Sequence, residues 1–259
     1  MSTLELLFLG TGTSAGVPMI GCHCAVCSST DARDKRNRAS VVISYDDTRV
    51  LVDTTPELRL QCVANRLDRI DAVVYTHAHA DHIMGLDDLR RFNAISGSSL
   101  DLWADPATHA SLESCFSYAF KPPAPESRLF RPHLIRRLIE GPFQIEGKTW
   151  TPIPLMHGDL TVLGFRVGTL AYCTDVSEIP ESSFALLEGL DVLVLDALQW
   201  KRHTTHFSVE QAMEAARRIG AKQTLFTHIA HALEHAETNK LLPEGMRLAF
   251  DGERVTARL

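Results

Sequence analysis

The chain has 259 residues, of which 45% are hydrophobic and 22% charged, which is enough apolar sequence for one sizeable core. Its formal net charge of −6 argues against a long nucleic-acid footprint, since such a surface needs many phosphate contacts, although small basic patches leave the question open. The sequence has no apolar run long enough to cross a membrane and no signal peptide, so we expect a cytoplasmic protein without a membrane partner.

Predicted strands and helices alternate along the chain. In the first half, strands are expected at residues 4–9, 40–45, 49–52, 71–75 and 100–104, and helices at 56–65, 86–92 and 106–117. In the second half, strands are expected at 150–156, 170–174, 191–195 and 223–227, and helices at 182–187 and 208–219. Clustered prolines at 121–127 favour an irregular loop. This order is typical of an α/β protein, and no linker divides it, so we expect one domain over residues 1–259.

The segment at 76–82 reads Thr-His-Ala-His-Ala-Asp-His and directly follows the strand expected at 71–75. Imidazole and carboxylate are the usual protein ligands for zinc and related divalent ions. His77 and His79 alternate, so they point the same way in an extended chain, whereas Asp81 and His82 follow a turn and can face a second point. The pattern predicts a site for two metal ions. The alternative is a degenerate site that has kept these residues and lost its partners.

Three further candidate ligands stand downstream, each directly after a predicted strand. They are His157, Asp175 and His228. Any one of them alone would be interpreted as a polar loop residue. Because a metal site built on strand ends needs ligands from several strands, the three together with the first motif form a coherent set.

A second motif lies in the loop at 21–27, where Cys22, Cys24 and Cys27 form a C-x-C-x-x-C pattern. Three thiolates this close suit a tetrahedral structural zinc that needs one more ligand, and His231 is a candidate. The alternative is three reduced cysteines in a loop, while a disulfide is disfavoured by the expected location. The other cysteines have no motif around them and are interpreted as buried or free thiols: Cys62, Cys115 and Cys173.

Together these motifs resemble the metallo-β-lactamase superfamily, and within it the PhnP group of phosphodiesterases, with ribonuclease Z as a more distant relative. The resemblance runs from residues 9–13 to residues 250–252. It implies an αββα sandwich, in which two mixed β-sheets lie between helices with the metals at one edge. It also implies that Asp53 supports the site from behind its ligands.

The resemblance assigns the ligands in three groups. One active-site ion would be held by His77, His79 and His157, the other by Asp81, His82 and His228, with Asp175 bridging the two ions. The structural zinc would be held by Cys22, Cys24, Cys27 and His231. The implied cofactors are two divalent ions, zinc or manganese, in the active site and one structural zinc.

The resemblance also singles out a histidine that is not needed as a ligand. In PhnP-like enzymes and ribonuclease Z, such a histidine near the metals is proposed to protonate the leaving oxygen or hold the phosphate, and His206 fits this position. Asp81 and His206 are therefore the candidate catalytic residues, with His203 as the competitor of His206. The remaining histidines are interpreted as surface or loop residues: His23, His109, His133 and His235.

The implied reaction is hydrolysis of a small or cyclic phosphodiester by a hydroxide that bridges the two metals. A tRNA-processing nuclease like ribonuclease Z stays open, although no basic tRNA-binding arm is evident, and so does a glyoxalase-type thioesterase. A non-enzymatic, PqqB-like protein of a cofactor pathway is a further alternative, which the intact histidine set disfavours. Homodimers are common in the family, so a homodimer is also an open expectation.

Overall fold

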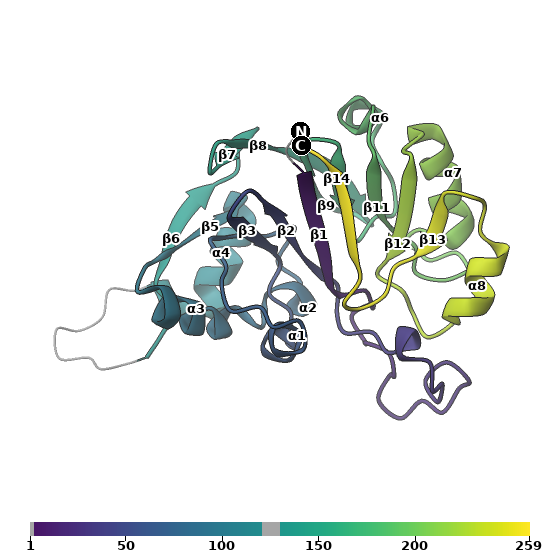
Figure 1. Cartoon of the computed structure of the whole chain (residues 1–259), viewed down its shortest axis with the longest axis horizontal. Helices are drawn as coiled ribbons and strands as arrows, with labels where there is room; N and C mark the ends of the chain where they lie inside the picture. The colour runs from purple at the N-terminus through teal and green to yellow at the C-terminus, as the bar shows by residue number, and fades with distance from the viewer. Residues whose placement is uncertain (1–2, 121–129) are drawn as a thin grey trace.

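Two seven-stranded mixed sheets lie face to face between two layers of helices (Figure 1). This arrangement is seen in the computed structural model, which describes residues 3–120 and 130–259. It confirms the αββα sandwich expected from the sequence. The loop expected at 121–127 lies outside the described residues.

The first sheet carries the N-terminal half of the chain and the last strand. Its strands pair antiparallel from β14 to β3 and parallel from β3 to β6. In spatial order they are β14 (Arg254–Arg258), β1 (Thr3–Gly10), β2 (Ser40–Tyr45), β3 (Thr48–Val52), β4 (Ala72–Val74), β5 (Leu100–Ala104) and β6 (Leu134–Leu138).

The second sheet repeats this plan with the other half of the chain. Its strands pair antiparallel from β7 to β10 and parallel from β10 to β13. In spatial order they are β13 (Met246–Leu248), β12 (Gln223–Thr227), β11 (Val192–Asp196), β10 (Leu170–Cys173), β9 (Leu160–Val167), β8 (Lys148–His157) and β7 (Phe143–Ile145).

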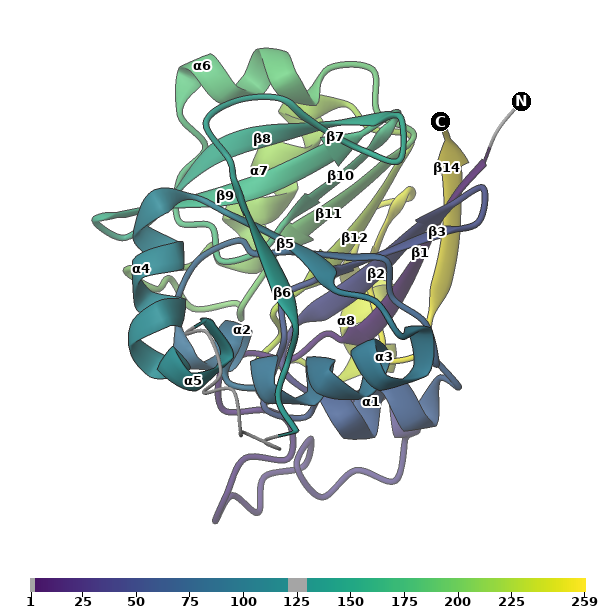
Figure 2. The same ribbon diagram turned by 90° about the vertical axis from the view of Figure 1, so that its left-hand side faces the viewer.

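Helices cover the outer face of each sheet (Figures 1 and 2). Those on the first sheet are α1 (Leu58–Ala64), α2 (Ala80–Ile83), η2 (Leu86–Asp88), α3 (Leu89–Ser96), α4 (Pro106–Cys115) and α5 (Ser117–Phe120). Those on the second are α6 (Glu181–Phe184), η3 (Ala185–Leu187), α7 (Val209–Ile219) and α8 (His235–Leu241). The short η1 (Ala32–Asp34) lies in the loop between β1 and β2. Within the described residues, no helix combines the length and apolar character needed to span a bilayer.

The central core lies between the sheets and includes Trp150, Tyr45 and Phe165, all essentially inaccessible to solvent. Two of its buried polar groups are paired, since Trp150 Nε1 donates to the Tyr45 hydroxyl at 3.1 Å and that hydroxyl donates to the Ile145 carbonyl at 2.9 Å. Two further cores lie between each sheet and its helices. Because the sandwich is packed on both faces, its strand ends are held firmly enough to position a site.

Two of the four histidines interpreted as surface or loop residues are in fact buried. His109 lies on the inner side of α4, where its Nε2 donates to the Arg137 carbonyl at 2.9 Å. His235 begins α8, and burial together with Arg36, which donates to His235 Nδ1 at 3.2 Å, lowers the pKa of this ring to about 4. The other two, His23 and His133, are exposed as expected.

Candidate metal centre

The candidate site residues collect where strands of both sheets end. Asp53 follows β3, His77 lies three residues after the end of β4, and His157 ends β8. From the second sheet, Asp175 follows β10 and His228 follows β12. Since the carboxyl ends of neighbouring parallel strands meet at one edge, side chains far apart in the sequence converge there.

The backbone is strained at this edge. Asp53, Asp175 and His228 all have left-handed backbone conformations, with φ of 64°, 57° and 59°. Such a conformation costs a residue other than glycine on the order of 1 kcal/mol or more, and it persists only where the surroundings enforce it. Three such residues at one edge indicate that the fold orients these side chains toward the site at a cost in stability.

Asp175 is the centre of the cluster. Its Oδ2 lies 3.9 Å from His77 Nε2, 3.9 Å from His157 Nε2 and 3.4 Å from His228 Nε2. Its Oδ1 lies 3.3 Å from His82 Nε2. The donor atoms of His77, His79, His157 and Asp175 lie within 4.8 Å of one another, and so do those of Asp81, His82 and His228. The structure therefore brings all seven expected ligands together in two adjoining groups.

The histidine rings are oriented by hydrogen bonds on their outer nitrogens. His82 Nδ1 donates to Asp53 Oδ2 at 2.8 Å, and His157 Nδ1 donates to the Thr205 carbonyl at 2.7 Å. His77 Nδ1 contacts Thr76 Oγ1 at 3.0 Å, and that hydroxyl donates to Asp53. In each ring this leaves Nε2 facing the cluster, an arrangement typical of metal-binding histidines. Asp53 thus occupies the supporting position expected from the sequence.

Burial and charge set the protonation of these rings. Burial lowers the pKa of His77 well below its usual value, so its Nε2 carries a free lone pair. Burial would also lower the pKa of His82, but the carboxylates of Asp175 and Asp53 outweigh it and raise that pKa well above its usual value. His228 and His82 hold the pKa of Asp175 well below its usual range against the effect of burial. Asp175 is therefore an ionised carboxylate at the centre of the cluster, beside a neutral His77 ring.

His206 lies beside the cluster and rests on a buried carboxylate. Its Nδ1 donates to Asp196 Oδ2 at 2.6 Å, and its ring centre lies 4.6 Å from that of His157 and 4.5 Å from that of His228. His203 is exposed, with its ring centre 5.4 Å from that of His206. Of the two histidines considered, His206 is therefore the one that faces the site.

Asp196 is a site residue that was not predicted from the sequence. The signal was present, because Asp196 ends a buried strand in the same way that Asp53 and Asp175 follow theirs. It also accepts a hydrogen bond from the Val176 backbone at 2.9 Å, which ties it to the loop after Asp175. Its partner could not be read from the sequence, since His206 lies ten residues away on a separate loop.

The cysteine motif forms a second cluster in the loop between β1 and β2. Cys22 Sγ and Cys24 Sγ each lie 3.3 Å from His231 Nδ1, and the four donor atoms including Cys27 Sγ lie within 4.8 Å of one another. Donor atoms around a tetrahedral zinc are ~3.5 Å apart. Hydrogen bonds from the Cys27 backbone and from His231 lower the pKa of Cys24 to about 6, which favours a thiolate. The expected group of four residues is therefore assembled.

The sequence pattern of the family described as "Beta-lactamase superfamily domain" matches residues 48–229. The chain belongs to the β-lactamase superfamily. With its fold and its histidine and aspartate cluster, it is a hydrolase of the metallo-β-lactamase type, and this fold implies divalent metal binding.

Members of the superfamily with known structures include close matches. "A New Diphosphatase from the PhnP Family" is 43% identical, with a TM-score of 0.92 over 99% of this chain and 98% of that one. Zn²⁺-bound PqqB from Methylobacterium extorquens has a TM-score of 0.79 over 97% of this chain and 99% of that one. At 21% identity, the PqqB likeness shows the fold alone.

A curated relative points to a different activity. The octanoyltransferase of Porphyromonas gingivalis is 36% identical over 253 residues, which are 96% of this chain and 51% of that protein. The chain thus spans about half the length of this relative. The name octanoyltransferase describes the whole relative, so it does not say which activity belongs to the half that this chain matches.

Proposed function

We propose that this chain hydrolyses small phosphodiesters at a centre of two divalent cations. The observation that carries the proposal is the position of Asp175, whose one carboxylate lies between 3.3 and 3.9 Å from the Nε2 atoms of four histidines. A carboxylate shared between two groups of imidazoles is what a pair of adjoining cations requires.

The residues present fit such cations. Within the described residues, Nε2 of His77, His82 and His228 is buried and makes no hydrogen bond of acceptable geometry. Buried polar atoms without partners are costly, and a cation would satisfy them. In the proposed assignment one ion is held by His77, His79 and His157, the other by Asp81, His82 and His228, and Asp175 serves both. Zinc and manganese both suit this donor set.

The bound cations and the protein side chains would act on different atoms of the phosphate ester. Bound divalent cations would make water more acidic and offset the negative charge on the phosphoryl oxygens. The water would lose one proton to solvent as its oxygen becomes bonded to phosphorus. The bond from phosphorus to the leaving oxygen would break, and His206 Nε2 would give that oxygen a proton. Asp196 holds the His206 ring with Nε2 directed away from the carboxylate.

We also propose that Cys22, Cys24, Cys27 and His231 hold a structural zinc. The support is the distance of 3.3 Å from both Cys22 Sγ and Cys24 Sγ to His231 Nδ1, the grouping of all four donor atoms within 4.8 Å of one another, and the thiolate character of Cys24. A zinc held by four protein ligands has no open position for water, so its part would be to fix the loop.

A second candidate reaction is hydrolysis of a diphosphate linkage. It is favoured by the 43% identity to the PhnP-family diphosphatase. Both reactions break a bond between phosphorus and oxygen and place the same demands on the site. Acyl transfer has weaker support, because the octanoyltransferase relative is twice as long as the match. A PqqB-like non-enzymatic role is disfavoured by the complete set of seven convergent ligands.

Metal content and turnover, measured on the same preparation, test the proposal. We expect about three metal ions per chain and metal-dependent cleavage of bis-p-nitrophenyl phosphate. A dinucleoside diphosphate is the second substrate and tests cleavage of a diphosphate linkage. Asp81→Ala should lose turnover and active-site metal. Asp47→Ala removes an exposed carboxylate elsewhere and should behave as wild type. Cleavage of thioesters with both phosphate substrates left intact by the metal-loaded protein would refute the proposal.

A further inference from the structure

A cavity of about 400 Å³ opens beside His77 and His79. Its walls come from the loop after β4, the first turns of α4 and the start of β9. Cavities of this size hold small organic ligands. Because two of the proposed metal ligands form one wall, a substituent of a phosphate bound at the metal centre has space to enter here.

The remaining walls of the cavity carry little charge. Ala78, Leu160 and Leu163 supply apolar surface, and no lysine or arginine appears among the described residues that line it. Among the described residues that line it, Asp105 is the one ionisable group besides the two histidines. A second phosphate entering this space would meet the Asp105 carboxylate and no lysine or arginine from these lining residues, which is unfavourable at short range.

The backbone donors at the start of α4 are already used and do not offer an anion site. The backbone N–H groups of Ala107 and Thr108 both donate to Asp105 Oδ1, at 2.8 and 3.0 Å. The positive end of a helix attracts an anion only through such free N–H groups and its dipole. Here Asp105 already occupies that position.

Two hydroxyl groups lining the cavity present acceptors. Thr108 Oγ1 donates to Asp105 Oδ2 at 2.8 Å, and Ser111 Oγ donates to the Ala107 carbonyl at 3.1 Å. With their hydrogens used in this way, both oxygens have only lone pairs left to offer. They therefore match hydroxyl or N–H donors on a ligand and do not match phosphate oxygens.

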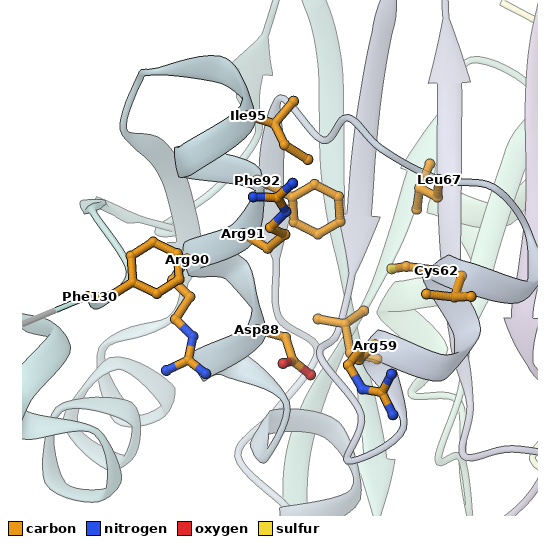
Figure 3. Close-up of a pocket in the computed structure, with 11 residues that line it drawn as sticks. Arg59, Cys62, Leu67, Asp88, Arg90, Arg91, Phe92, Ile95 and Phe130 are labelled. Atoms are coloured by element: carbon orange, nitrogen blue, oxygen red, sulfur yellow. The ribbon is translucent and has the colours of Figure 1, made fainter.

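A pocket lined by several arginines lies elsewhere in the described part of the chain. It lies between α1 and α3, has a volume of about 330 Å³ and carries Arg59, Arg90 and Arg91 (Figure 3). It shares no lining residue with the cavity beside His77 and His79. The positive charge of this chain is thus not concentrated where the substrate substituent would lie.

We infer that the cavity beside His77 and His79 receives an uncharged substituent of the phosphate ester, about the size of a nucleoside and bearing hydrogen-bond donors. This inference rests on the proposed function and defines its substrate class. Substrates whose substituent carries a second phosphate are disfavoured.

Three substrates with the same leaving group test the inference. They are the p-nitrophenyl phosphodiester of thymidine, the same compound with a second phosphate on the other sugar hydroxyl, and methyl p-nitrophenyl phosphate. We expect kcat/KM for the thymidine ester to exceed that for the methyl ester at least about tenfold, as filling a pocket usually achieves. The doubly phosphorylated ester should be slower than the thymidine ester by a similar factor.

A charge placed in the cavity should reverse the preference. Thr161 lines the cavity and is exposed on β9, so Thr161→Arg should raise kcat/KM for the doubly phosphorylated ester relative to the thymidine ester about tenfold. Thr149→Arg makes the same change at an exposed position of β8, roughly 25 Å along the strand from His157, and should leave the ratio unchanged.

Binding of products separates this inference from the proposed function. Calorimetry should show that thymidine monophosphate binds about tenfold more tightly than thymidine bisphosphate. In Thr161→Arg the difference between these two affinities should be smaller. If no ester is cleaved but this preference holds, the proposed reaction is wrong and the cavity assignment stands. If the bisphosphate binds as well as the monophosphate, or if both arginine variants behave alike, the cavity assignment is wrong.

Discussion

The surroundings of His206 and His203 distinguish the candidate favoured from the sequence from its competitor. His206 is buried and its Nδ1 is fixed by Asp196, while His203 is exposed and its Nδ1 contacts Thr205. A fixed ring with one free nitrogen directed at a reacting group is the arrangement that proton transfer requires.

Replacing His206 should therefore slow reactions according to the leaving group. His206→Gln is expected to lower kcat about 100-fold or more for alkyl phosphodiesters, which expel a basic oxygen, and much less for p-nitrophenyl esters, which need no proton. Initial rates on both substrate types check this. His203→Gln is the matched control and should change neither rate by more than a few fold. Equal losses on both substrates would assign His206 to phosphate binding instead of proton transfer.

At this scale the sequence predicts which residues meet but not always what surrounds them. The ligands follow apolar strands in a pattern that places them at one edge, so their convergence could be foreseen. The burial of His109 could not, because it depends on the Arg137 carbonyl of a strand 28 residues away. Polar residues whose partners are distant in sequence are the ones that a pattern fails to interpret.

Helix α7 shows how an element supports the site. Its first turn is closed by a capping box, in which Ser208 Oγ accepts from the Gln211 backbone at 3.3 Å and the Gln211 side chain accepts from the Ser208 backbone at 3.1 Å. The neighbouring Phe207 backbone N–H donates to the Val176 carbonyl at 2.6 Å. The cap therefore fixes the segment that carries His206 against the loop that carries Asp175.

Removing this cap should lower the stability of the chain. Ser208→Ala is expected to lower the free energy of unfolding by about 1 kcal/mol, since the Gln211 backbone N–H loses its partner. Denaturant unfolding measures this change. Ser182→Ala, at an exposed position of α6, should stay within about 0.5 kcal/mol of wild type. Equal unfolding energies for the two variants would show that the capping box contributes nothing measurable.

Elements with strong local signals were predicted, and edge elements were not. The N-cap serine and Gly220, with φ of 69° at the C-cap, delimit α7 as expected. Strands β6, β7, β13 and β14, which all lie at sheet edges, were missed. The interior strand β9 was missed as well, although it has eight residues. Strand β8 tolerates Pro152 and Pro154 because β7 pairs only with residues 148–150, so the missing N–H groups face no partner strand.

In the whole molecule, the two clusters lie on different parts of the chain but share one short segment. His228 belongs to the histidine cluster, and His231 to the cysteine cluster. The backbone of this segment is also tied to the first loop, where the Thr13 N–H donates to the Ile229 carbonyl at 3.1 Å and the Ile229 N–H donates to the Thr11 carbonyl at 2.9 Å.

Disrupting the cysteine cluster should therefore lower the stability of the whole chain as well as its metal content. Cys24→Ser is expected to reduce metal content by about one ion per chain and to lower the melting temperature, at about 2–4 °C for each kcal/mol lost. Metal analysis and thermal unfolding measure both effects. Cys115→Ser, at an exposed cysteine outside the cluster, is the control and should change neither. Unchanged metal content in Cys24→Ser would refute the structural zinc.

The segment from His228 to His231 would link the two proposed metal sites thermodynamically. An ion held by His231 would restrict the backbone that presents His228, so occupancy of the cysteine cluster would lower the entropic cost of loading the histidine cluster. Linkage is reciprocal, so loading the histidine cluster would tighten binding at the cysteine cluster by the same factor. With both sites loaded, the affinity of this chain for metal would be a property of the pair, and a titration of either site would report the state of the other.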